Sequence, residues 1–138
     1  MADKTTQKVA QLKMISPQFV VADVKLAAEY YRDVLGFKVL GYFLEPPVYA
    51  IVQRDSVEIH FGKADQETDV ASNSRRRAGS LDAYIWVTDV DALHAELTPR
   101  GARIVEGPIK TIYDCYEFVV EDQFGYRLAF GMDISPRT

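Results

Sequence analysis

The chain has 138 residues, of which 48% are apolar, enough for a hydrophobic core in one domain or in two small modules that share it. Its formal net charge of −4 gives nucleic acid and anionic membrane surfaces no electrostatic reason to bind. The single cysteine, Cys115, excludes an internal disulfide and multi-cysteine metal centres. Together with the lack of an apolar signal or membrane segment, it predicts a cytoplasmic protein.

The first half of the chain predicts the element order βαβββ. Residues 1–13 are polar and are expected to form an arm. Residues 14–23 predict a strand, because Pro17 argues against a helix. Asp23 predicts the N-cap of a helix that ends at Gly36. Alternation and turn residues then predict strands at 37–43, 48–53 and 57–61.

The second half repeats this order after a polar linker at 66–79. Its basic run of Arg75, Arg76 and Arg77 is either a solvated charge run or a contact for an anion or another subunit. A strand at 81–87 precedes a helix from about 90 to 99, capped by Thr88 or Asp89. Further strands are expected at 102–106, 113–120 and 126–131. The segment FVVADV at 19–24 aligns with IWVTDV at 85–90, and GFKVLG at 36–41 aligns with GARIVEG at 101–107.

This internal repeat predicts an α+β fold of two βαβββ modules, at 14–65 and 80–134, followed by a tail at 135–138. Helices would lie outside two curved mixed sheets that surround a central cavity.

The strand at 57–61 has two chemically different faces. Val57, Ile59 and Phe61 form an apolar side, whereas Glu58 and His60 point together to the other side. The same reasoning on neighbouring strands predicts a ligand-binding trough lined by Gln18, Tyr49, Glu58, His60, Asp82, Tyr84, Trp86 and Tyr116. Aromatic and acidic side chains suit a planar or cationic organic ligand. The same residues also fit a structural role, as a satisfied polar pair and core aromatics.

Three stretches carry a family resemblance over residues 14–134: ADVKLAAEYYRDVLGFKVLG, TDVDALHAELTPRGARIVEGP and EFVVEDQFGYRLAFG. They resemble the vicinal oxygen chelate superfamily, most of all its glyoxalase and bleomycin-resistance type. The resemblance implies the glyoxalase/bleomycin resistance/dihydroxybiphenyl dioxygenase fold. In metal-using members it also implies ligands at the positions of Ser16, Glu58, Asp82 and Ala129. Alanine cannot bind a metal and serine is a poor ligand, so the site is incomplete.

Two main functions follow from this resemblance. The first is a metal-free, homodimeric binding protein, of the kind that confers antibiotic resistance, with no cofactor and no residue assigned a catalytic role. The alternative is a divalent-metal-dependent lyase or isomerase similar to lactoylglutathione lyase, or an extradiol-type dioxygenase. Its metal would be held by Glu58, His60 and Asp82. A regulatory or subunit role without a small ligand is a third possibility.

Overall fold

The structure is a computed structural model that describes residues 8–136. The predicted arm and tail therefore lie partly outside the described residues. No helix within 8–136 is long and apolar enough to cross a membrane.

The first module has the predicted order of one strand, one helix and three strands: β1 (Gln18–Val21), α1 (Val24–Asp33), β2 (Lys38–Phe43), β3 (Tyr49–Arg54) and β4 (Val57–Lys63). The sheet order is β1-β4-β3-β2, with β1 parallel to β4. Asp23 is the N-cap of α1, because its Oδ1 accepts the backbone N–H groups of Lys25 and Leu26. The strand β1 begins four residues later than predicted, directly after Pro17, which has no N–H to donate.

The linker is more ordered than the sequence predicts. It contains a short 3-10 helix, η2 (Glu67–Asp69), and a short α-helix, α2 (Asn73–Arg76). The Asp82 carboxylate accepts the N–H of Asn73, and the Asn73 amide donates to the Leu81 carbonyl. These bonds fix α2 to the start of the second module, so composition alone could not reveal it.

The second module repeats the first: β5 (Ala83–Trp86), α3 (Val90–Leu97), η3 (Thr98–Arg100), β6 (Ile104–Lys110), β7 (Cys115–Glu121) and β8 (Arg127–Asp133). Its sheet order is β5-β8-β7-β6, with β5 parallel to β8. Asp89 rather than Thr88 caps α3, since its Oδ1 accepts the N–H of Ala92. The strand β6 continues past its predicted end at 106, because register shifts accommodate Gly107 and Pro108.

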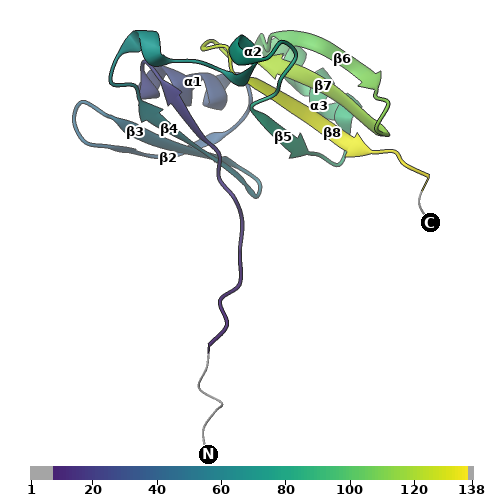
Figure 1. Cartoon of the computed structure of the whole chain (residues 1–138), viewed down its shortest axis with the longest axis horizontal. Helices are drawn as coiled ribbons and strands as arrows, with labels where there is room; N and C mark the ends of the chain where they lie inside the picture. The colour runs from purple at the N-terminus through teal and green to yellow at the C-terminus, as the bar shows by residue number, and fades with distance from the viewer. Residues whose placement is uncertain (1–7, 137–138) are drawn as a thin grey trace, which may run out of the picture.

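Each sheet is covered by its helix on one face, so the predicted α+β architecture is confirmed. Neither four-stranded sheet closes into a barrel. Figure 1 shows the two modules side by side, with the segment that carries α2 passing between them. We call the face opposite the helix the helix-free face of each sheet. Its polar side chains come from alternate strand positions.

The two modules are joined through residues on the helix side of their sheets. The Tyr31 hydroxyl of α1 donates to the buried Asp122 carboxylate at 2.8 Å. The rings of Phe19 and Tyr126 stack with centroids 4.5 Å apart, and one core cluster contains buried residues of both modules. Within one chain, the helix-free faces are therefore left for other contacts.

Candidate functional site

Four of the predicted site residues form one hydrogen-bonded chain on the helix-free face of the first sheet. Gln18 Nε2 donates to the Tyr49 hydroxyl at 2.6 Å, and that hydroxyl lies 2.7 Å from His60 Nδ1. His60 Nε2 lies 2.8 Å from Glu58 Oε1. The strand register explains the grouping, because Gln18 pairs with His60 across β1 and β4.

When the imidazole of His60 is neutral, all hydrogen bonds of this chain donate in the same direction, from Gln18 toward Glu58. The Tyr49 hydroxyl accepts from Gln18 and donates to Nδ1 of His60, so the ring proton lies on Nε2 and points to Glu58. The side chains of Glu58 and His60 are 21% and 23% exposed. The arrangement can therefore present the Glu58 carboxylate and the Tyr49 phenol to a ligand in fixed positions, or hold a proton within this chain of hydrogen bonds.

The helix-free face of the second sheet carries an aromatic and acidic cluster. Glu117 is only 3% exposed, and its Oε1 accepts the hydroxyls of Tyr84 and Tyr113 at 2.8 Å each. Burial, with Cys115 and Glu117 as neighbours, raises the pKa of Tyr84. Burial, reinforced by the bond to Glu117, raises the pKa of Tyr113 to about 12. Both phenols therefore stay protonated and donate at neutral pH.

Trp86 extends this cluster toward solvent. Its ring lies 4.7 Å from the ring of Tyr84, and it is 63% exposed. A large aromatic group exposed to this degree beside a second ring offers a surface on which a planar ligand can stack.

The two networks occupy equivalent places in the internal repeat. Tyr49 pairs with Gly62 on β4, and Glu117 pairs with Gly131 on β8, so Tyr49 and Glu117 are counterparts. In the first sheet, Gln18 of β1 reaches across β4 to Tyr49. In the second sheet, Tyr84 of β5 reaches across β8 to Glu117 in the same way. Sequence reasoning missed both Glu117 and Tyr113. Extending the alignment of the two halves to the strand of Tyr49 is the signal that could have identified Glu117.

Two predicted site residues lie elsewhere. Tyr116 was expected in the trough, but it points to the helix side, where its hydroxyl donates to Asp91 of α3 at 2.6 Å. Its neighbour Glu117 takes the opposite face. The carboxylate of Asp82 is occupied by the backbone N–H groups of Asn73 and Arg127, each at 2.8 Å. Asp82 therefore anchors the linker to β8 through both of its oxygens.

The donors of the alternative metal site do not fit a divalent ion. Glu58 and His60 bond to each other, and the second nitrogen of His60 bonds to Tyr49. Both oxygens of Asp82 accept backbone N–H groups, and Ala129 offers no donor. Within residues 8–136, no three His, Cys, Asp or Glu side chains are grouped so as to hold a metal ion.

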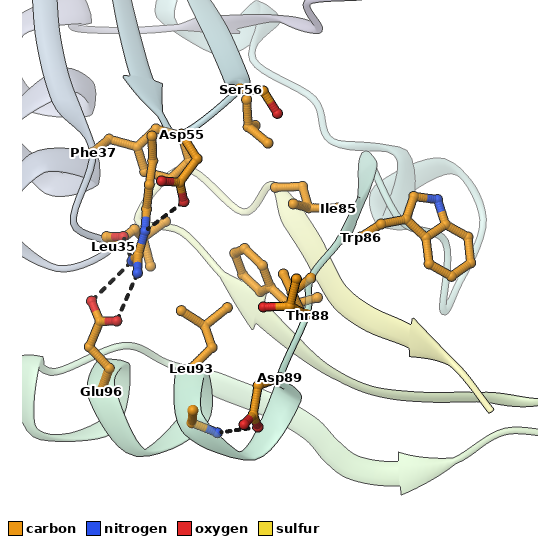
Figure 2. A pocket seen from close by; sticks show the side chains of 15 residues that line it. Leu35, Phe37, Asp55, Ser56, Ile85, Trp86, Thr88, Asp89, Leu93 and Glu96 are labelled. Carbon is orange, nitrogen blue, oxygen red and sulfur yellow. Dashed lines mark hydrogen bonds and ion pairs between the residues drawn. The ribbon is translucent and has the colours of Figure 1, made fainter.

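A separate hollow of about 550 Å³ lies between the modules. Figure 2 shows its walls, formed by the loop between α1 and β2, the β3–β4 turn, the end of β5 and one side of α3. Arg54 bridges one side, because its guanidinium bonds to both oxygens of Glu96 at 2.7 and 3.0 Å. Of the predicted ligand-binding residues only Trp86 borders the hollow, and its indole points away from the other walls (Figure 2).

Comparison with known proteins identifies the family. The model of the Glyoxalase/Bleomycin resistance protein/Dioxygenase superfamily matches residues 11–130. The chain belongs to this superfamily. The resemblance inferred from the sequence is thereby confirmed. No curated protein matches the chain at a significant level.

Several solved structures share the fold of this chain at low sequence identity. The bleomycin-binding protein from bleomycin-producing Streptomyces verticillus, complexed with copper(II)-bleomycin, is 21% identical, with a TM-score of 0.67 over 88% of this chain and 97% of that one. TioX from Micromonospora sp. ML1 is 19% identical, with a TM-score of 0.68 over 87% and 98%. A glyoxalase/bleomycin resistance protein/dioxygenase from Nocardioides is 13% identical, with a TM-score of 0.66 over 98% and 92%.

Proposed function

We propose that this protein binds a small organic compound without a metal, in the manner of bleomycin-resistance proteins, and that the compound is aromatic or cationic. The ligand would lie against the helix-free faces. The observation that carries the proposal is the exposed Trp86 ring beside Tyr84, on a face that also carries the buried Glu117 carboxylate. Rings bind planar and cationic groups through stacking and through their quadrupole.

The networks on both sheets support this proposal because they are ordered before any ligand arrives. Glu58, His60 and Tyr49 hold one another in place, and Tyr84 is fixed by Glu117. Side chains that are already immobilised lose little entropy when a ligand binds. The acidic groups favour a positively charged ligand, while the rings supply apolar contact.

Absence of a metal is part of the proposal and rests on the donor set. A catalytic divalent site commonly needs three protein ligands with free lone pairs. Here the nearest candidates, Glu58 and His60, are committed to each other, and Asp82 is committed to the backbone. Sequestration requires affinity and no chemistry, so it does not need these donors.

We also propose a homodimer that covers the helix-free faces. Residues 8–17 extend away from the body of the chain (Figure 1), and several apolar side chains of this segment are exposed: Val9, Leu12, Met14 and Ile15. The edge strand β2 exposes Leu40, Tyr42 and Phe43. Apolar side chains gathered in this way mark an interaction surface, and a second copy of the chain offers a surface of the same chemistry.

Calorimetric titration tests the proposal. Chelator-treated protein is titrated with metal-free bleomycin and with the planar cation proflavine. We expect saturable binding of at least one of them, weakened at least tenfold by Trp86→Ala and by Glu58→Gln. Tyr116→Phe is the matched control, because this tyrosine lies on the helix side, and it should bind as the parent does. Binding that requires added zinc, nickel or manganese would contradict the proposal and favour the metal-dependent alternative.

A further inference from the structure

We call the region where the two modules contact each other the junction. The internal repeat relates the residues at one end of this junction to the residues at the other end. Phe19 pairs with Phe61 across β1 and β4, and Ile85 pairs with Phe130 across β5 and β8. Phe19 and Ile85 are therefore counterparts. Both lie on the helix side of their sheets and pack against the common core.

Tyr126, which stacks on Phe19, and Val57, which lines the hollow together with Ile85, are counterparts as well. Tyr126 and Val57 each lie four positions before the paired phenylalanine of their own module. Val57 begins β4, and Tyr126 immediately precedes β8. The turn before Tyr126 has an additional residue, and its Phe124 packs against the core. The turn before Val57 is shorter and contains Asp55 and Ser56 instead.

One end of the junction is filled by these aromatic side chains. The rings of Phe19 and Tyr126 are nearly parallel, with an interplanar angle of 8° and centroids 4.5 Å apart. Tyr126 also donates its hydroxyl to the Val20 carbonyl. Tyr31 and Asp122 close the same end with a buried hydrogen bond.

The other end is the hollow of about 550 Å³. Ile85 and Val57 stand where the first end has a pair of stacked rings, and both border the hollow. Leu35, Leu93 and Phe130 complete an apolar floor. The Arg54–Glu96 bridge joins α3 to the end of β3 here, as the Tyr31–Asp122 bond joins α1 to the β7–β8 turn at the other end. The volume lies in the range of small-molecule sites. At the positions of Val57 and Ile85, the hollow therefore lacks the pair of stacked rings that Tyr126 and Phe19 supply at the other end.

The charge around the hollow is negative. Its lining contains one guanidinium, from Arg54, and three carboxylates, from Asp55, Asp89 and Glu96, which gives a net charge of −2. Arg54 is committed to Glu96 and to the Leu35 carbonyl. Asp89 uses Oδ1 to cap α3, and the Asp55 carboxylate lies 4.0 Å from Nε of Arg54, with its side chain 91% exposed. The guanidinium of Arg54 is thus shared by Glu96 and Asp55, so the lining keeps a negative balance that favours an organic cation above the apolar floor.

We propose that this hollow is a second binding site, distinct from the helix-free faces, for a compact aromatic cation such as an arylammonium or arylamidinium. The ring would take the place that the Phe19–Tyr126 stack fills at the other end of the junction. The cationic group would lie at the rim, near Asp55 and Asp89.

The test uses the full ¹⁵N-labelled chain and two probes of the same shape, the cation benzamidine and its neutral analogue benzamide. Benzamidine should shift the amide resonances of Val57, Ile85 and Leu93 in a saturable way, and benzamide should bind at least tenfold more weakly. Val57→Tyr, which places the side chain of position 126 in the hollow, should weaken benzamidine at least tenfold. Ile85→Phe repeats this test if the first variant does not fold.

Asp89→Asn separates charge from shape, because asparagine also caps helices. We expect it to weaken benzamidine several-fold and to leave benzamide unchanged. Proflavine binding at the helix-free faces should survive Val57→Tyr, which distinguishes failure of this proposal from failure of the proposed function. The proposal is overturned by unchanged benzamidine affinity in folded Val57→Tyr, by shifts confined to Tyr84 and Glu117, or by no saturable shift at all. It is also overturned if the hollow resonances respond only to self-association, which would make a second copy the occupant.

Discussion

At the scale of single residues, Gly131 decides whether the aromatic cluster can form. A Cβ at this position would lie 2.0 Å from the Tyr84 hydroxyl oxygen and 2.7 Å from its Cζ, so the ring must move. Gly131→Ala should therefore break the bond between Tyr84 and Glu117 and destabilise the fold by about 2 kcal/mol. Denaturant unfolding measures this loss, and the Trp86 emission should change with it.

Gly62 is the matched control, because it holds the equivalent position in the first sheet. A Cβ there would meet the Tyr49 ring at 3.9 Å, which is ordinary contact. Gly62→Ala should change stability by less than about 1 kcal/mol. Equal losses in the two variants would show that Tyr84 does not lie across Gly131.

Asp122 should give the fold a distinct pH dependence. Burial raises the pKa of its carboxyl from 3.8 to about 6, against the opposing bonds from Tyr31 and from the N–H groups of Phe124 and Tyr126. Since the folded-state pKa lies above the unfolded one, the folded state binds the proton more tightly. The free energy of unfolding therefore falls, by up to about 3 kcal/mol, as the pH rises from about 4 to about 6.

Asp122→Asn removes this titration while its oxygen can still accept the two backbone N–H groups. Unfolding free energies of both proteins between pH 4 and pH 7 provide the test. The variant should gain stability relative to the parent as the pH rises through this interval. Parallel curves would mean that Asp122 titrates alike in the folded and unfolded chains.

Strand alternation predicted well which face the side chains take in the first sheet, and it predicted this poorly in the second sheet. Glu58 and His60 sit on a strand with one apolar face, so their common direction could be predicted. The strand β7 is buried on both faces over most of its length, and no alternation marks which face Tyr116 takes. Glu117 was missed for the same reason. The hydrogen bonds of Asp82 could not be predicted because its partners, Asn73 and Arg127, lie on two other segments.

At the scale of elements, the two helix caps allow a graded comparison. Asp23 accepts two backbone N–H groups, and Asp89 accepts one. Asp23→Ala should cost about 1 kcal/mol or more, and Asp89→Ala should cost less. Asn at either position should restore most of the loss. Urea unfolding measures the difference, and a larger loss at Asp89 would contradict the cap assignment.

The elements themselves were largely predictable from local chemistry. Caps, glycines and alternation predicted both helices and the order of the strands. The exceptions depend on distant or proline-related contacts. The helix α2 needs the carboxylate of Asp82, and β6 continues through Pro108 because its register shifts there.

At the scale of the whole molecule, the exposed apolar segment before β1 should control assembly. If a second copy covers it, light scattering during gel filtration should give a dimer mass for the parent. Leu12→Asp and Ile15→Asp should shift the mass toward the monomer, since both side chains are at least 90% exposed in the single chain. Gln11→Asp adds the same charge to the same segment and should stay dimeric. A parent that is monomeric at high concentration would refute the dimer.

The repeat predicted two modules but could not predict how they join. The junction depends on Tyr31 with Asp122, on Phe19 with Tyr126 and on Arg54 with Glu96. The two residues of each pair are far apart in the sequence, so no local pattern predicts their contact. The hollow between the modules was unpredictable for the same reason.

Emission from Trp86, the single tryptophan of the chain, gives the most direct test of ligand binding without a metal. Chelator-treated protein is titrated with metal-free bleomycin and with proflavine, and the emission is followed to saturation. We expect a saturable change for at least one compound, with the same dissociation constant after zinc or nickel is added. A change that occurs only with the added metal, or no change with either compound, would contradict the account.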